Sequence, residues 1–286
     1  MQHGPAVRRR KLGAELRALR TSAELTSGEA ARLVGWHQSK VSRIETGASG
    51  VKPADVRLLL DAYRVADANL RELLLVLAGS DESGGRHHWW HAYRGVLPPT
   101  YRDFISLESQ ASAMRTLETS VVPGLLQTPE YARAVTRAAV DGLDEERLDA
   151  LVEVRLARQD ILRAQPPLEL SAVLDEAVLR REVGGPEVMA RQLKRLLEAA
   201  RLPQVRLQVL PFTAGAHVGI TGPFVILSFS RTSDLDVVVL DHLTSSLYLE
   251  RKEDLQAYTE AFNTLQIHAL SPEDSLDYLA VIGGRA

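Results

Sequence analysis

The sequence predicts two domains of different fold class: an all-α domain of five helices at residues 1–79, and an α+β domain at residues 101–286. A linker and an aromatic anchor at residues 80–100 join them. A chain of 286 residues exceeds one small domain. Apolar residues recur with helical spacing up to about residue 79, whereas the later part mixes helical segments with short β-branched runs. The polar, glycine-rich stretch GSDESGG at residues 79–85 separates the two patterns.

The composition is that of an ordinary soluble globular protein, with 45% hydrophobic and 25% charged residues. Because the chain has no cysteine, it has no disulfide, no thiolate metal site and no cysteine nucleophile. It also lacks an apolar run of about 18 residues and an apolar signal core behind its basic N-terminus. We therefore expect a cytoplasmic protein without a membrane segment, a cofactor or a bound metal.

The charge is unevenly distributed along the chain. Residues 1–80 contain 13 Lys and Arg against 8 Asp and Glu, while the remainder contains 21 against 29. The densest basic cluster covers the N-terminal arm and the first predicted helix, at Arg8, Arg9, Arg10, Lys11, Arg17 and Arg20. Such a cluster is typical of a surface that meets an anion, although by itself it also fits a solvated helix face.

The spacing of apolar residues predicts the first helix, and a capping motif predicts the start of the second. The first has an apolar stripe at helical spacing, made of Leu12, Leu16 and Leu19. Thr26, with Glu29 three residues later, is a capping box that starts the second helix. Gly35 ends that helix, because a helix end often needs the left-handed backbone that glycine adopts without strain.

Three further helices complete the first domain. The third runs from Gln38 to Thr46 and stops at Gly47, the fourth begins near Pro53, and the fifth covers residues 68–78. The buried side of the fourth helix is predicted to contain Leu58, Leu59 and Tyr63.

The second domain mixes both kinds of element. An aromatic segment at residues 88–93, which holds two of the three tryptophans, is expected to anchor the linker. Helices are predicted at residues 101–119, 129–141, 143–164, 186–201 and 252–269. Strands are predicted at residues 168–174, 205–210, 224–229, 237–240 and 246–249.

The spacing around Gly35 is typical of a helix-turn-helix. Four residues before this turn, Ala31 supplies the small side chain that lets two helices cross closely. The inner faces on both sides of the turn need apolar residues, and the sequence provides Ala30, Val34, Trp36, Val41 and Ile44. Together with the flanking helices and the basic first helix, this pattern predicts a domain that binds DNA.

If Val41 and Ile44 face inward, helical geometry turns Gln38, Ser39, Ser42 and Arg43 outward, toward base edges in the major groove. Gln38 suits adenine and Arg43 suits guanine, although Arg43 could instead contact phosphate. Phosphate contacts, which position the protein without reading sequence, are expected from Arg8, Arg9, Arg10 and Lys40. One recognition helix reads few bases, so we expect a homodimer on an operator with two half-sites.

Residues 25–47, ending in VSRIETG, closely resemble the xenobiotic-response-element family of phage-repressor-like regulators. The resemblance implies a repressor-like fold of five helices. It also implies an ion pair between Arg20, at the end of helix one, and Glu45 of the final Glu-x-Gly, which holds the recognition helix in place. Position 37 departs from the pattern, because it is histidine where small polar caps are more common.

Residues 121–133, VVPGLLQTPEYAR, look like a hallmark of a large actinobacterial regulator family. So do residues 210–212, 215–217 and 222–224. These regulators resemble the antitoxin-like members of gene pairs, in which a small partner protein is encoded alongside. The resemblance brings no catalytic motif, so we expect no enzyme activity.

The segment from Phe212 to Pro223 is read as a loop between two strands, with Gly215, Gly219 and Gly222 along it. Loops of this kind often line a binding cleft, although the plainer interpretation is simply a long strand connection. If the loop binds a ligand or a partner, the candidate residues are Phe212, His217 and Phe224.

Two other kinds of site are weaker alternatives. His87, His88 and His91 have helical spacing that could hold a metal, but no further ligand lies near them and two tryptophans there favour packing. The residues for acid-base catalysis are present at Asp175, Glu176, His217, Asp241 and His242, but carboxylates after strands are common helix caps.

The sequence therefore supports two functional hypotheses. The first is a dimeric, sequence-specific transcription regulator. Its second domain supplies the dimer contacts and receives a signal from a small partner protein or a ligand. The second is an antitoxin-like module that sequesters a small partner, with DNA binding serving autoregulation. Reciprocal coupling between partner binding and DNA affinity would favour the first.

Overall fold

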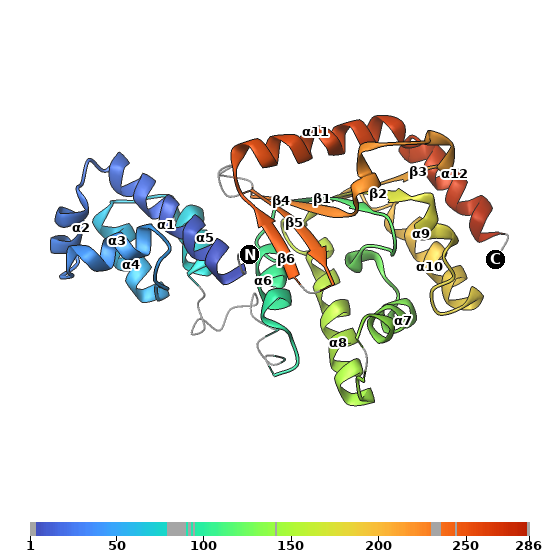
Figure 1. The fold of residues 1–286 in the computed structure, drawn as a ribbon, viewed down its shortest axis with the longest axis horizontal. Helices are drawn as coiled ribbons and strands as arrows, with labels where there is room; N and C mark the ends of the chain where they lie inside the picture. Colours follow the sequence, from blue (N-terminus) through green and yellow to red (C-terminus); the bar gives the residue numbers. More distant parts are fainter. Residues whose placement is uncertain are drawn as a thin grey trace. The chain divides into compact units, whose positions relative to one another are not determined.

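The computed structural model describes residues 4–78, 90, 93, 95–140, 142–229, 236–243 and 245–284, with the backbone alone at residues 4–11, 76, 99 and 100. The chain divides into two compact units, Met1–His88 and Trp89–Ala286 (Figure 1). The predicted fold class is confirmed: the described part of the first unit is all-α, and the second combines helices with a six-stranded sheet.

Five helices form the described part of the first unit: α1 (Gly4–Ser22), α2 (Ser27–Leu33), α3 (Gln38–Glu45), α4 (Pro53–Ala62) and α5 (Ala68–Leu77). Their apolar faces meet in a buried core that includes Leu12, Leu16, Ala30, Ala31, Val41, Ile44, Val56, Leu59, Leu60, Tyr63, Leu74 and Leu77. The predicted basic arm is part of α1, which begins before the predicted stripe.

One core prediction in this unit is wrong. Leu58 was expected on the buried side of α4, but 47% of its surface is exposed, while Val56 and Leu60 are buried. At about 100° per residue, Val56, Leu59, Leu60 and Tyr63 share one face of the helix, and Leu58 projects away from it.

The second unit alternates helices and strands. Its helices are α6 (Pro99–Glu108), α7 (Pro129–Ala139), α8 (Glu145–Ala157), α9 (Glu176–Arg180), α10 (Pro186–Ala199), α11 (Lys252–His268) and α12 (Pro272–Gly283). Its strands are β1 (Ala113–Glu118), β2 (Glu169–Asp175), β3 (Val205–Leu210), β4 (Phe224–Ser228), β5 (Val237–His242) and β6 (Ser245–Leu249). Short 3-10 helices in the described residues are η2 (Gly124–Leu126), η3 (Arg158–Arg163), η4 (Phe212–Ala214) and η5 (Val218–Thr221).

The structure corrects two predicted elements of this unit and adds two helices that the sequence analysis missed. Residues 101–119 are a helix followed by strand β1, because residues 113–118 pair with a strand on each side. The helix predicted at residues 143–164 ends at Ala157 and continues as η3. Helices α9 and α12 were not predicted.

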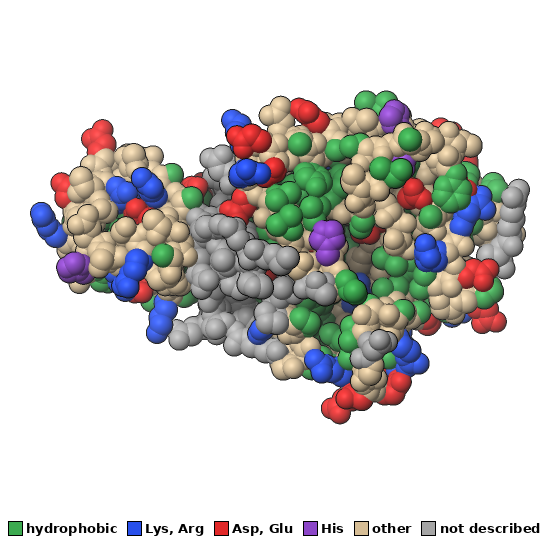
Figure 2. Space-filling view, viewed as in Figure 1, with side chains coloured by type: hydrophobic (Ala, Val, Ile, Leu, Met, Phe, Trp, Pro, Cys, Tyr) green, Lys and Arg blue, Asp and Glu red, His purple; other side chains and the backbone are tan. Residues whose placement is uncertain are grey.

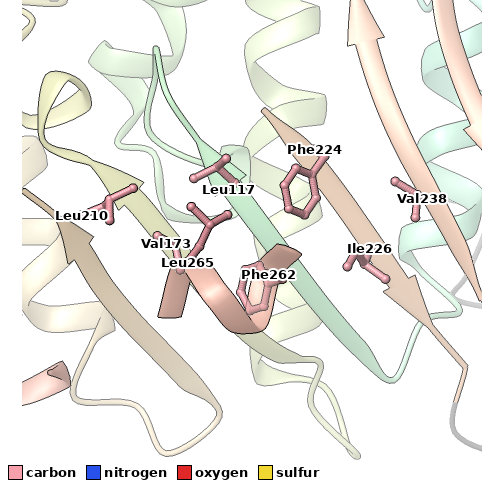
Figure 3. Close-up of a cluster of buried hydrophobic side chains, with 8 residues drawn as sticks. All are labelled: Leu117, Val173, Leu210, Phe224, Ile226, Val238, Phe262 and Leu265. Atoms are coloured by element: carbon pink, nitrogen blue, oxygen red, sulfur yellow. The ribbon is translucent and has the colours of Figure 1, made fainter. Parts of the chain in front are cut away.

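The sheet has the strand order β3-β2-β1-β4-β5-β6. Strands β1, β2 and β3 are parallel to one another. Strand β4 pairs antiparallel with β1, β5 pairs antiparallel with β4, and β6 pairs antiparallel with β5. Figure 1 shows α11 along one face of the sheet and α7 and α8 on the opposite side. Under α11, strand residues Leu117, Val173, Leu210, Phe224, Ile226 and Val238 pack with Phe262 and Leu265 of the helix (Figure 3).

The carboxyl ends of the parallel strands share one edge of the sheet. β1, β2 and β3 end there at Glu118, Asp175 and Leu210. The chain then passes from β3 to β4, which lies beyond both β2 and β1 in the strand order. Residues 211–223 therefore cross the ends of these two strands, at the edge where open α/β sheets commonly bind ligands.

No helix within the described ranges has the length and apolar character needed to cross a membrane.

Candidate nucleic-acid interface

The turn between α2 and α3 is fixed by short local contacts. Thr26 Oγ1 accepts a hydrogen bond from Glu29 N at 3.2 Å, and Thr26 N donates to Glu29 Oε2 at 2.8 Å, so the predicted capping box is present. Gly35 has φ +71°, in the left-handed region, and Trp36 N donates to Ala31 O at 2.7 Å. These contacts set the direction in which α3 leaves α2.

Helix α3 has a buried face and an exposed polar face. Val41, Ile44 and Glu45 are buried against the domain. The exposed residues are those predicted to read bases, Gln38, Ser39, Ser42 and Arg43. The helix therefore packs against the domain through its buried face and presents four polar side chains to solvent. A recognition helix needs this arrangement.

The N-terminus of α3 is held by side chains that also lie on its exposed face. His37 is the N-cap, and its Nδ1 accepts from Ser39 N at 3.4 Å and lies 3.0 Å from Ser39 Oγ. Gln38 Nε2 donates to Ser27 Oγ at 3.0 Å, which ties the starts of α3 and α2 together. The histidine that departs from the family pattern therefore still performs the cap, and α3 begins at Gln38.

A nearly buried ion pair holds the other end of α3. Arg20 Nε and Nη2 donate to the two Glu45 carboxylate oxygens at 2.7 and 2.9 Å, and Arg20 Nη1 donates to Leu25 O at 2.6 Å. The ion pair implied by the family resemblance is thus present in a two-pronged form. Tyr63 is buried beside it, and burial together with the Glu45 charge raises the pKa of the Tyr63 phenol.

Gly13 is a structural residue of this interface that the sequence analysis missed. It lies on α1 where that helix crosses the end of α3. A Cβ atom at this position would lie 2.4 Å from Ile44 O and 2.7 Å from Glu45 O, far inside van der Waals contact. The only sequence signal was a glycine within a helical stripe, a residue that weakens a helix by about 1 kcal/mol relative to alanine.

The residues predicted to contact phosphate have different environments. Arg8, Arg9 and Arg10 belong to α1, but their side chains lie outside the described part of the structure. Lys40 Nζ lies 3.0 Å from Asp55 Oδ2 and 3.6 Å above the Trp36 ring. Lys40 therefore joins α3 to α4 within the domain, whatever it contributes to phosphate binding.

The three residues of the second unit that were predicted to contact a ligand or a partner lie in different environments. Phe212 is 58% exposed at the start of η4, and His217 is almost covered, with 11% of its side chain exposed. Phe224 is buried in the core under α11, near Phe262 (Figure 3). Its ring meets the rings of Tyr258 and Phe262 edge to face. The prediction that Phe224 contacts a ligand or a partner is therefore wrong. Its side chain packs in the core, on the strand that follows the loop.

The carboxylates considered for acid-base catalysis have structural partners. Asp175 caps α9 by accepting from Ala177 N at 2.8 Å, and its Oδ2 lies 3.7 Å from His217 Nε2. Glu176 accepts from Phe212 N at 2.8 Å and pairs with Arg180. Burial alone would raise the pKa of Glu176, but these hydrogen bonds outweigh it and lower the pKa.

The remaining candidates do not join this group. Asp241 and His242 are exposed at the end of β5. His87, His88 and His91, considered for a metal, lie outside the described residues.

The hallmark segment at residues 121–133 serves the fold of the second unit. Leu125 and Leu126 are fully buried, and Tyr131 OH accepts from Val122 N at 3.0 Å. The buried Gln192 side chain bonds both Leu126 O and Thr128 N at 2.8 Å. The motif is thus a packed corner between β1 and α7, and its residues are mostly unavailable to a ligand.

Glu118 is a titratable residue that the sequence analysis did not single out. It is partly exposed at the carboxyl end of β1, and Thr116 Oγ1 lies 3.3 Å from its Oε1. Desolvation raises the pKa of Glu118 to about 8; the Asp241 charge adds to this rise, whereas the Thr116 hydrogen bond and Arg155 oppose it.

The raised pKa of Glu118 predicts a pH-dependent stability that Glu118→Gln removes. The carboxyl ionises near its ordinary value of 4.5 in the unfolded chain and near 8 in the folded one, so stability falls as pH rises between these values. Relative to the wild type, the glutamine variant should gain roughly 1 to 3 kcal/mol between pH 5 and pH 9, a range reduced from the full shift because the group is partly exposed. Urea denaturation across this pH range measures the difference, and parallel pH profiles for the two proteins would contradict the prediction.

Models of two known families match the chain, one in each unit. The model of the family described as Domain of unknown function (DUF5753) matches residues 101–280, and that of a helix-turn-helix domain matches residues 11–74. No curated protein and no solved structure matched the chain. The helix-turn-helix match agrees with the geometry of α2 and α3 and supports a DNA-binding regulator.

Proposed function

Because the chain belongs to the DUF5753 family and carries a helix-turn-helix domain ahead of that region, we propose that it is a sequence-specific transcription regulator of the xenobiotic-response-element type. It binds operator DNA as a homodimer, and its second unit receives a signal from a small partner protein or a ligand. It has no enzymatic role. The observation that carries the proposal is the polar face of α3, supported by a rigid frame of buried contacts.

Base readout is assigned to Gln38, Ser39, Ser42 and Arg43. Gln38 already uses one amide hydrogen on Ser27, which orients the amide before DNA arrives. Arg43 is exposed, and its guanidinium fork matches the two acceptors that guanine shows in the major groove. Because buried contacts already hold α3 in place in the free domain, little ordering is required when DNA binds, and this favours affinity.

The proposal predicts preference for a two-fold operator. A palindromic fragment from upstream of the gene should bind far more tightly than a scrambled fragment of the same length at about 150 mM salt, where non-specific binding is already weakened. Fluorescence anisotropy with both fragments measures the ratio. Equal affinities would overturn the proposed function.

Arg43→Ala is expected to reduce the preference for operator over scrambled DNA by about 5- to 150-fold, because a two-pronged contact with guanine contributes about 1 to 3 kcal/mol of discrimination. Arg43→Lys is the matched control for charge: it should keep the salt dependence and still lose discrimination, since lysine lacks the planar fork. Arg9→Ala should weaken both fragments alike and flatten the salt slope. If Arg43→Ala also weakens both fragments alike, Arg43 contacts phosphate.

A further inference from the structure

Two serines of α3 carry the same hydroxyl group in different surroundings. Ser39 and Ser42 are both exposed on the polar face of the helix. His37 is exposed as well, and Figure 2 shows a histidine side chain at the surface of the first unit. The His37 Nδ1 atom lies 3.0 Å from Ser39 Oγ. Within the described ranges, Ser42 Oγ has no such side-chain partner.

The N-cap of α3 determines which nitrogen of the His37 ring carries the proton. Ser39 N donates to His37 Nδ1 at 3.4 Å, so Nδ1 presents a lone pair to the helix. The hydrogen of the neutral imidazole is then on Nε2. Because Nδ1 has no hydrogen to give, the serine hydroxyl must be the donor in the 3.0 Å contact between Ser39 Oγ and Nδ1.

This contact leaves Ser39 with acceptor capacity alone. A serine hydroxyl has one hydrogen and two lone pairs, and the hydrogen of Ser39 is directed at His37. The hydroxyl of Ser42 rotates freely and donates or accepts as the base requires. In the major groove, adenine N6 and cytosine N4 are amino donors, whereas guanine O6 and thymine O4 are acceptors. Opposite a guanine or a thymine, Ser39 would place two acceptors together with no hydrogen between them.

The neighbouring residue Gln38 has the same kind of support. Its Nε2 donates one hydrogen to Ser27 Oγ at 3.0 Å, so its Oε1 and its second amide hydrogen remain for a base. Gln38 and Ser39 are the first two residues of α3, and the N-terminal residues of a recognition helix are those that contact base edges. The His37 cap therefore lies where it controls base choice.

We propose that His37 is a positioning residue that fixes Ser39 as a hydrogen-bond acceptor, so that Ser39 reads the amino group of an adenine or a cytosine. The proposal rests on the proposed function, because it assigns a class of base to one side chain of the recognition helix. It goes beyond that function by giving a part in base choice to a residue outside the four assigned to readout.

Replacing single bases of the operator tests this assignment. Each base pair is replaced in turn, in both half-sites of the palindromic fragment, and fluorescence anisotropy measures the affinity of the full chain for each fragment. At one position, fragments with adenine or cytosine should bind about tenfold more tightly than those with guanine or thymine, an effect typical of one mismatched base pair. Ser39→Ala should remove this preference, and Ser42→Ala, the matched control, should retain it.

Two changes at position 37 separate the positioning of Ser39 from the capping of α3. Glycine is well tolerated as an N-cap, so His37→Gly should keep the helix and lose the preference, because the freed hydroxyl of Ser39 then donates as well as accepts. His37→Asn keeps an acceptor at the cap and should retain most of the preference. Circular dichroism confirms that both variants stay folded.

Four outcomes would overturn the role of His37. They are a preference for guanine or thymine that depends on Ser39, no base preference that depends on Ser39, an unchanged preference in His37→Gly, and an equal loss in the two His37 variants. In each of these cases the operator still binds more tightly than scrambled DNA, so the proposed function stands. Equal affinity for operator and scrambled DNA would instead remove the proposed function and this inference with it.

Discussion

Replacing Gly13 with alanine is expected to destabilise the N-terminal domain by about 3 kcal/mol or more and to abolish operator binding, because the added methyl group overlaps backbone atoms of α3. The Cβ would lie 2.4 Å from Ile44 O and 2.8 Å from Glu45 C. Backbone at the end of a packed helix cannot rotate away as a side chain can. The clash must therefore separate α1 from α3 and strain the Arg20–Glu45 pair that joins them.

The matched control is Gly28→Ala, in α2. The nearest atom to its added Cβ is Thr26 Oγ1 at 3.9 Å, so nothing has to move. Alanine is the better helix former by roughly 0.5 to 1 kcal/mol, and this variant should be as stable as the wild type or more so. Hydrogen exchange of α1 and α3 amides in the full chain, followed by mass spectrometry, locates the effect. Protection in Gly13→Ala equal to that of the wild type would contradict the argument.

Gly13 illustrates which part of the interface the sequence could predict. The cap at Thr26, the turn at Gly35 and the inward positions of Val41 and Ile44 depend on neighbours within a few residues, and their signals are local. The need for glycine at position 13 arises from Ile44 and Glu45, more than 30 residues away. Without the fold, a glycine in a helix indicates only a weak position.

Strand β1 shows the same limit in the second unit. Its sequence, AMRTLE, is rich in good helix formers, so local propensity favoured the helix that was predicted. The segment is a strand because it pairs with β2 on one side and β4 on the other, and this pairing overrides propensity. Helix α12 is a different case: Ser271 and Pro272, followed by two acids, are a plain start signal that the sequence analysis overlooked.

Replacing Arg158 with methionine is expected to destabilise the second unit by about 3 to 5 kcal/mol, because it leaves the Glu108 carboxylate buried without a counter-charge. Arg158 Nε and Nη2 each donate to Glu108 at 2.7 Å, and Nη1 donates to Tyr101 OH at 2.6 Å. The side chains of the pair are only 5% and 2% exposed. Urea denaturation followed by circular dichroism measures the loss, and Arg155→Met, on a partly exposed neighbour, serves as the control.

The double variant Glu108→Leu, Arg158→Met separates the pair's own contribution from the penalty of an unpaired buried charge. Each single change leaves one polar group of the pair without its partner, whereas the double change removes both and fills the space with apolar atoms. The double variant should therefore be more stable than either single variant, and a loss equal to the sum of the two would contradict this. Glu108 lies on α6, and Arg158, 50 positions later, is the C-cap residue of α8 and the first residue of η3. A recovered stability would therefore show that apolar packing suffices to hold α6 against the end of α8.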